Sequence, residues 1–380
     1  MLTIFDRSDR VLLGGAFVAI VVAGVTRYTP VPSVMAFVFA AVAVAVLASV
    51  VGRCVEHLSE RLGSGGTGVL QSALGNLPEL FIAFFALKAG LLTVVQSALI
   101  GSILANLLLV LGAAFVVGGL RHGNQTFNSD RVRSTCVLLV VATAALVLPS
   151  LASYTHTPAE QHVRALSDAV AVVLLIIFAL SLPASLRRGT GERSAARAGG
   201  GAVASGGTGG GGEGAGGAPA GGEPAHEARW PLGVAIGLLT GVSLAAALVS
   251  DWFIHALEPA MDSLGISEAF AGLVIVAIAG NAIENFVGIQ LAGRNQADFA
   301  MAVIINSPLQ IALVLAPALV LLSLFTATTL TLVFAPMLVV SVVLAVLLVS
   351  LIVFDGESSW LEGVALIALY VIIAMVFWWG

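Results

Sequence analysis

The chain has 380 residues, of which 59% are hydrophobic and 10% are charged. A mean hydropathy of +1.06 is too high for a soluble domain of this length, so the composition indicates an integral membrane protein. The formal net charge of −5 is spread along the chain without a basic stripe, which disfavours a nucleic-acid-binding protein. We therefore expect the lipid bilayer as a partner and no nucleic acid.

Apolar segments of transmembrane length follow one another along the chain. A transmembrane helix needs roughly 20 apolar residues. We expect the first segment to be retained as a helix, because no small-x-small cleavage site follows it before Arg27. The eleven segments are 11–27, 33–57, 67–88, 93–118, 132–151, 165–186, 231–254, 269–292, 298–323, 330–353 and 360–379. The predicted fold class is an all-α integral membrane protein with about 11 transmembrane helices.

A stretch dominated by Gly and Ala separates the sixth segment from the seventh. Such a composition cannot bury a core, so we expect a disordered linker over 187–230. The linker divides the chain into a leading helix (1–30), a first five-helix repeat (31–186) and a second five-helix repeat (231–380).

The 16 Lys and Arg residues divide unevenly between the two sets of loops. Arg27, Lys88 and Arg164 lie on one side, and the other 13 (16 − 3) lie on the side of the N-terminus and the linker. Because Lys and Arg are enriched in cytoplasmic loops, we predict a cytoplasmic N-terminus and linker and an external C-terminus, in a prokaryotic inner membrane. Five helices is an odd number, so the second repeat enters the membrane inverted, as is typical of secondary transporters.

A short acidic motif occurs twice in these apolar surroundings. Gly75-Asn76-Leu77-Pro78-Glu79 is matched 205 residues later (284 − 79) by Gly280-Asn281-Ala282-Ile283-Glu284. In both copies a Ser follows the Glu by 23 residues (102 − 79 = 307 − 284). Neither Glu is close to a predicted helix end, and a carboxylate at mid-bilayer costs roughly 2.5–3.5 kcal/mol unless a cation or a proton neutralises it.

Side chains that offer neutral oxygens accompany the two glutamates. Hard cations prefer such ligands together with carboxylates, and no Cys or His joins them with ligand spacing, which disfavours zinc or copper. We also expect Pro78 and Pro308 to free the backbone carbonyls of Leu74 and Ile304. The predicted cation- and proton-binding residues are Glu79, Glu284, Asn76, Asn281, Ser102, Ser307, Gln310 and Asn106, with Glu79 and Glu284 as the metal ligands.

Simpler interpretations stay open for several of these residues. A buried Glu can be protonated and hydrogen-bonded to a neighbouring helix, Asn76 and Asn281 can join helices by hydrogen bonds, and Gly or Ser can serve close helix packing. Glu56 and Asp251, near the ends of the second and seventh segments, are weak candidates for a cation entrance, and a solvated helix end is the default interpretation of both.

The motifs resemble those of the cation/proton exchangers (CAX), the calcium/proton antiporters of the calcium/cation antiporter superfamily. The likeness is carried by Gly75–Glu79 with Val95–Gly112, and by Leu264–Phe270 with Gly280–Glu284 and Gln310–Leu313. The resemblance implies that Glu79 and Glu284 hold calcium and protons alternately. This sequence has Asn285 where the family usually has His, and Asn306-Ser307-Pro308 where Gly-Ser-Ser is usual.

Together these features predict a secondary active antiporter that exchanges calcium, or a related divalent cation, for protons by alternating access. It is expected to be no enzyme and to need no cofactor besides the transported ions. A sodium/calcium exchanger or another cation exchanger of the same superfamily is the nearest alternative, and a passive cation channel is a further one. An intramembrane hydrolase would need a nucleophile with a base, or a pair of Asp, at membrane depth, and the sequence offers neither. The oligomeric state is not specified by the sequence.

Overall fold

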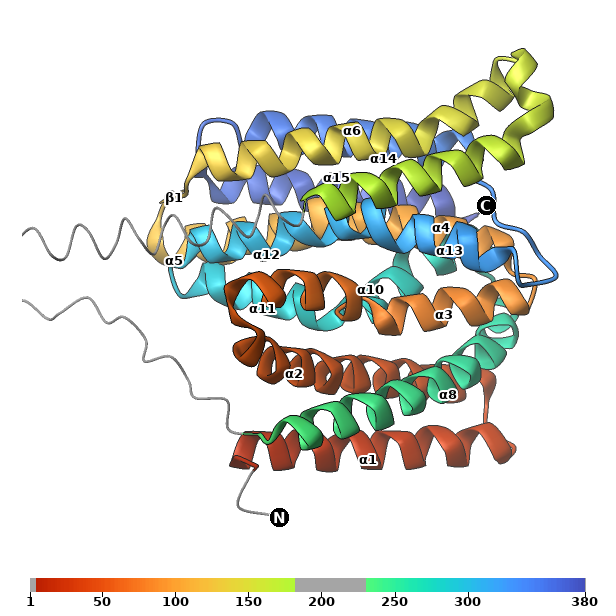
Figure 1. Ribbon diagram of the computed structural model, residues 1–380, viewed down its shortest axis with the longest axis vertical. Helices are drawn as coiled ribbons and strands as arrows, with labels where there is room; N and C mark the ends of the chain where they lie inside the picture. Colours follow the sequence, from red (N-terminus) through yellow and green to blue (C-terminus); the bar gives the residue numbers. More distant parts are fainter. Residues whose placement is uncertain (1–4, 182–229, 380) are drawn as a thin grey trace, which may run out of the picture.

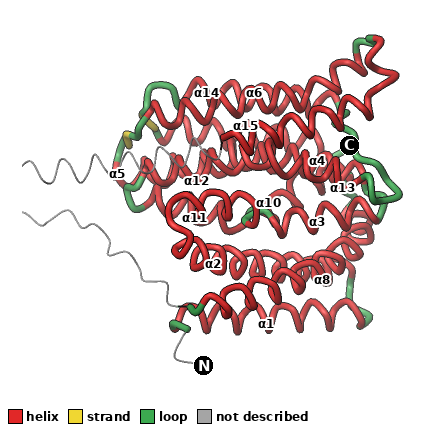
Figure 2. Tube along the Cα trace, viewed as in Figure 1, coloured by secondary structure: helices red, strands yellow, loops and turns green. Residues whose placement is uncertain are grey.

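The computed structural model describes residues 5–181 and 230–379, with the side chains of 59–73 and of residue 283 excepted. The predicted linker therefore lies outside the described residues apart from Trp230. Nearly all of the described chain is helical, and most of the helices run along one common direction (Figure 1, Figure 2).

The first half of the chain contains α1 (Arg7–Tyr28), α2 (Ser33–Leu74), α3 (Leu77–Lys88), α4 (Leu92–Leu104), the π-helix η1 (Ala105–Val110), α5 (Leu111–His122), β1 (Gln125–Thr126), α6 (Ser129–Tyr154) and the 3-10 helix η2 (Pro158–His162). A helix continues from η2 to Ser181.

The second half contains α8 (Leu232–Leu264), α9 (Glu268–Phe270), the π-helix η3 (Ala271–Val276), α10 (Ala277–Gly280), α11 (Ala282–Gly293), α12 (Ala297–Gln310), the π-helix η4 (Ile311–Leu315), α13 (Ala316–Ser323), α14 (Pro336–Ile352), β2 (Glu357–Ser358) and α15 (Trp360–Trp378).

The length and apolarity of these helices confirm the predicted membrane class. Within the described ranges, eight helices are long and apolar enough to cross a bilayer, and a ninth crossing results if Glu268–Gly280 and Glu284–Gly293, which meet at 65°, count as one. α14 is a shorter apolar helix of 17 residues. Each of the eleven predicted segments contains a helix, although 330–335 of the tenth segment are not helical, and the number of crossings stays a prediction.

The turns between helices gather at two ends of the molecule. At one of them, here named the β-strand end, β1 pairs antiparallel with β2, and Gln125 lies opposite Ser358. Gln125 Nε2 also donates to the Ala292 carbonyl of α11, at 3.0 Å. The turns after α5, α11 and α14 therefore meet at this end, and the N-terminus lies on the same side, whereas the C-terminus lies at the opposite end (Figure 1).

At the opposite end a buried segment without regular secondary structure joins α13 to α14. Leu330, Leu332 and Phe334 are each at most 2% exposed. Their backbone groups bond to side chains instead of to a strand: Ser150 Oγ accepts from Phe334 N and donates to the Leu332 carbonyl, both at 2.9 Å, and Ser167 Oγ accepts from Leu332 N at 3.0 Å. Since buried backbone groups need partners, these contacts account for two serines within apolar helices.

α1, α2 and α8 form one layer along the side of the molecule (Figure 1), and a buried carboxylate joins them. Asp9 of α1 is 3% exposed. It accepts from Arg53 Nε of α2 and from the indole Nε1 of Trp230, just before α8, both at 3.2 Å. The Trp230 ring also stacks on His57 with ring centroids 4.3 Å apart. Asp9 therefore holds the leading helix to both halves of the chain.

Replacement of Asp9 by Ala should destabilise this layer. It removes the acceptor of a buried indole N–H and of a guanidinium, which costs roughly 1–3 kcal/mol for a buried donor left without a partner. The measurement is thermal unfolding of the purified protein in detergent, with Asp262→Ala on the exposed surface of α8 as the control. A midpoint of Asp9→Ala equal to that of the control would show that the carboxylate does not hold the layer together.

Candidate cation site

Both glutamates lie in the first turn of a short helix that begins at a break. α2 ends at Leu74 and α3 begins at Leu77, whereas α10 ends at Gly280 and α11 begins at Ala282. Asn76 and Asn281 are the residues that precede the two new helices. The expectation that neither Glu is near a helix end is therefore wrong. Apolar residues flank both breaks, so the apolar pattern alone does not reveal them.

The break depends on the Gly-Asn pair rather than on proline. Pro78 lies in the first turn of α3, where a missing backbone N–H is tolerated because no helical partner exists for it. The predicted segment 67–88 suggested one continuous helix kinked at Pro78. The structure instead has two helices, and Pro78 belongs to the start of the second. The second copy has no proline in its motif and is broken at the same place.

The helix starts stabilise negative charge at this depth. The first backbone N–H groups of a helix have no partner in the helix, and the helix dipole favours an anion there by roughly 0.3–1 kcal/mol, and by up to about 2 kcal/mol in partly buried sites. Glu79 and Glu284 occupy this position in α3 and α11. The breaks therefore offset part of the cost of placing two carboxylates among apolar helices.

Glu79 is held by groups from both halves of the chain. Its Oε1 accepts a hydrogen bond from Ser102 Oγ of α4, at 2.7 Å, and a second one from the amide Nδ2 of Asn281. The same amide lies 3.1 Å from Ser102 Oγ. The Asn of the second motif thus serves the Glu of the first, a crossing that the sequence did not predict.

Glu284 lies close to the same centre and is less enclosed. Its side chain is next to Ser307 of α12, and its carboxylate is near enough to Glu79 for the two charges to interact. Asn76 Nδ2 donates to Gln310 Oε1 at 3.4 Å. All four residues were predicted for the site, and the structure brings them together with Glu79, Ser102 and Asn281.

Several oxygens at this centre are buried without a hydrogen-bond partner among the described residues. They are Glu79 Oε2, Glu284 Oε2, Ser307 Oγ and Asn106 Oδ1. Asn106 Nδ2 donates to the Ser102 carbonyl of its own helix at 2.9 Å, whereas Oδ1 accepts no hydrogen bond from the described residues. Because buried polar atoms are normally satisfied, this set of carboxylate, hydroxyl and amide oxygens is suited to a hard cation or to protons.

The donor set determines which ions fit. Within the described ranges, no three or more His, Cys, Asp and Glu side chains are grouped so that they could hold a metal ion. A cation bound here would therefore have two carboxylates and several neutral oxygens as ligands. A small cavity beside Glu79, bordered by Ala83, Ala98, Leu99 and Ser102, provides space next to the carboxylate.

The two candidate entrance residues are held elsewhere. Glu56 forms an ion pair with Arg53 on its own helix, at 3.1 Å. Asp251 does not end its helix as predicted, because α8 continues to Leu264, and its carboxylate lies 3.6 Å from His255 Nδ1. The structure does not bring either carboxylate into the site.

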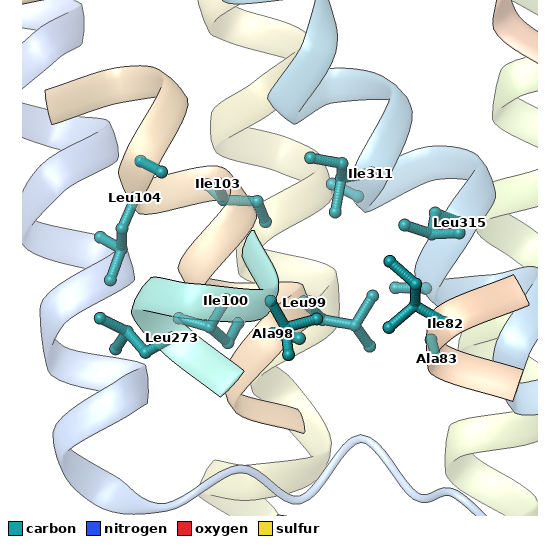
Figure 3. Packing of buried hydrophobic residues seen from close by; sticks show 14 of the residues in the cluster. Ile82, Ala83, Ala98, Leu99, Ile100, Ile103, Leu104, Leu273, Ile311 and Leu315 are labelled. Carbon is teal, nitrogen blue, oxygen red and sulfur yellow. The ribbon is translucent and has the colours of Figure 1, made fainter. Parts of the chain in front are cut away.

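Two glycines allow the helices around the site to approach closely. A Cβ on Gly101 would collide with the backbone of Leu273 in η3, and one on Gly280 would lie 2.5 Å from Glu79 Cγ. Figure 3 shows Leu273 beside Ile100 and Ala98 of α4. The packing interpretation of these glycines is confirmed, and at Gly280 the packing also fixes the position of Glu79.

Gly280→Ala should therefore impair transport more than an ordinary glycine substitution in a helix. The added methyl group must displace the Glu79 side chain from Ser102 and Asn281, so we expect transport to fall at least tenfold. The matched control is Gly237→Ala in α8, where an added Cβ meets nothing within 4 Å. Flux of the two variants in proteoliposomes, with equal amounts of inserted protein, is the measurement. Equal flux would mean that the position of Glu79 is not critical.

Polar sites on two broken helices of a helical membrane protein are typical of the class of secondary transporters. More specifically, the chain belongs to the sodium/calcium exchanger protein family, whose model matches residues 32–186 and 234–379.

Similar curated proteins include a Ca(2+)/H(+) antiporter of Aphanothece halophytica, 33% identical over 342 residues that cover 90% of this chain and 89% of that protein. Another is the Ca(2+)/H(+) antiporter ChaA of Bacillus subtilis, 36% identical over 347 residues that cover 91% of this chain and 92% of that protein. The resemblance to calcium/proton antiporters is thereby confirmed.

Solved structures agree with this assignment. Native YfkE superposes with a TM-score of 0.74 at 33% identity, over 97% of this chain and 98% of that one. The H+/Ca2+ exchanger CAX superposes with a TM-score of 0.69 over 96% of this chain and 91% of that one, and at 16% identity it supports the fold alone.

Proposed function

We propose that this protein exchanges calcium for protons by alternating access and that Glu79 and Glu284 bind either ion. The observation that carries the proposal is the meeting of these two residues at the starts of two half-helices, each with a buried carboxylate oxygen that has no partner among the described residues. The names of the antiporters from Aphanothece halophytica and Bacillus subtilis support calcium and protons as the ions.

Charge balance explains why such a site exchanges ions. One divalent cation neutralises two carboxylates, and two protons do the same. An empty, doubly charged site in an apolar bundle costs roughly 2.5–3.5 kcal/mol per carboxylate on insertion scales. The loaded forms are therefore the ones that can move between the two access states, while the empty form is held back. Exchange, rather than one-way leak, follows from this difference.

The hydrogen bond from Asn281 to Glu79 couples ion binding in one half of the chain to the position of the other half. Asn281 belongs to the second motif and donates to Glu79 of the first. When a cation or a proton binds the unpartnered Oε2 of Glu79, it reduces the negative charge of the carboxylate and so weakens the hydrogen bond that Oε1 accepts from Asn281. Binding at one carboxylate thus alters the contact between α3 and the start of α11, which is where the two halves meet at the site.

Glu79→Gln and Glu284→Gln should each reduce proton-coupled calcium flux at least a hundredfold. Gln keeps the size of Glu and one oxygen ligand, but it has no titratable charge to balance calcium or to exchange a proton. Both variants should still insert, because removal of a buried charge lowers the membrane penalty.

The measurement uses proteoliposomes with a set pH gradient and a calcium-sensitive dye inside. Glu258→Gln, an exposed residue of α8, serves as the matched control and should transport like the wild type. Near-normal proton-coupled flux in either site variant would exclude that Glu as a coupling group.

We further propose that the β-strand end faces the cytoplasm, from the 13 to 3 division of Lys and Arg. A reporter that is active only in the periplasm should be inactive when inserted at residue 210 and active when fused after Gly380. A periplasm-active fusion at residue 210 would reverse this orientation. The same reporter inserted after Ser181, where the described helix ends, should also be inactive.

Sodium/calcium exchange is the second candidate function, because the matching family is described as sodium/calcium exchangers. The two candidates differ in the driving gradient. A sodium gradient at equal pH on both sides should drive little calcium flux if protons are the counter-ion, whereas a pH gradient without sodium should drive it fully. A conductive channel would instead show calcium flux without any counter-gradient.

A further inference from the structure

One face of α12 differs sharply from its counterpart on α4. With the offset of 205 residues, the four positions Val94, Ser97, Ala98 and Gly101 correspond to Phe299, Ala302, Val303 and Asn306. All four residues on α4 are buried, because this face packs on η3 (Figure 3). None of the four residues on α12 is buried, and Phe299 is 65% exposed.

The residues at the deepest of these positions differ in kind. Gly101 has no side chain, and its backbone lies against the backbone of Leu273. Asn306 occupies the matching position of α12 and exposes an amide. The two copies of the motif therefore present a closed contact on one side of the site and a polar group on the other.

Asn306 lies between the site and the β-strand end. Gly288 of α11 packs against Ile304 of α12, which fixes how these antiparallel helices are aligned. In this alignment the exposed Gln290 is nearest to the α11–α12 turn, Asn306 is deeper, and Glu284 is deepest. The three polar residues therefore lie at successive depths between the β-strand end and the site.

The amide of Asn306 needs hydrogen-bond partners that lipid does not supply. Its side chain makes no hydrogen bond with any other residue in the part of the chain that the structure describes, and hydrocarbon offers none. An amide at this depth is stable if it faces a hydrated crevice. Asn306 also directly precedes Ser307, which lies next to Glu284, so Asn306 is within one helix position of the site.

We infer that Asn306 is a side-specific cation ligand, which binds the divalent cation as it moves between the β-strand end and Glu284. The inference rests on the proposed function and extends it. At the opposite end the matching position is Gly101, which offers no side-chain ligand. The affinity for calcium should therefore differ between the two sides of the membrane, and Asn306 should account for part of that difference.

Cysteine labelling tests whether the position is hydrated and close to the cation. In a background with Cys54 and Cys136 replaced by Ala, both of which are buried free thiols, Asn306→Cys should react with a membrane-impermeant thiol reagent supplied on the β-strand side. Millimolar calcium should slow this reaction at least fivefold. Leu344→Cys, at a 57% exposed apolar position of α14, is the lipid-facing control and should react only with an apolar, membrane-permeant maleimide.

Transport kinetics test the sidedness. Asn306→Gly, which restores the residue of the other copy, should raise the half-saturating calcium concentration at least fivefold on the β-strand side and change it less than twofold on the other. Inside-out and right-side-out vesicles give the two values, and Phe299→Ala on the same face of α12 is the control. The inference would be overturned if Asn306→Cys reacted only with the apolar maleimide, as Leu344→Cys does, or if calcium did not slow its labelling. An equal change of the half-saturating calcium concentration on both sides in Asn306→Gly would also overturn it.

These outcomes are separate from a failure of the proposed function. If Glu79→Gln and Glu284→Gln transport normally, the exchange mechanism itself is wrong. If those variants are inactive while Asn306→Gly behaves like the wild type on both sides, only the role of Asn306 is refuted.

Discussion

Two carboxylates inside an apolar bundle are the constraint on which the rest of this structure depends. Water cannot solvate them there as it does at a surface, so the protein has to supply charge, dipoles and hydrogen bonds. It does so by interrupting two helices at Gly75-Asn76 and Gly280-Asn281, which directs the starts of α3 and α11 at the glutamates. The breaks expose backbone groups that are tolerated because they lie within protein.

The packing around the site follows from the same requirement. Broken helices must be held by their neighbours, and α4 lies so close to η3 that Gly101 has no space for a side chain. Ser102, on the next position of the same helix, donates to Glu79. One helix therefore provides both the contact that holds the broken segment and a ligand for the carboxylate.

Much of the architecture could be predicted because it depends on local pattern. Apolar segments of sufficient length mark the helices, and the repeated Gly-Asn-x-x-Glu with its Ser at a fixed distance indicated that Glu79, Ser102, Glu284 and Ser307 belong to one site. A repeat detects residues that have the same role, and for that reason it located both acids and their companions in the sequence.

The contacts that the pattern missed are those between segments far apart in the chain. A repeat suggests that Asn281 serves its own Glu284, whereas Asn281 donates to Glu79. Asp9 precedes the first apolar run and carried no signal, since its partners Arg53 and Trp230 lie 44 and 221 positions away. The helix breaks were hidden because their flanking residues are as apolar as the helices themselves. Asn306 was noted in the sequence only as a departure from a family pattern. The role proposed for it depends on the exposure of its side chain, which only the structure shows.

The measurement that tests the central claim most directly is the number of protons released when calcium binds. Purified protein in weakly buffered detergent solution is titrated with calcium while the pH is recorded. If Glu79 and Glu284 hold protons and calcium at the same oxygens, binding must release protons, approaching two per calcium as the pH is lowered, and Glu79→Gln or Glu284→Gln must reduce this number. Calcium binding without proton release at any pH would contradict the account.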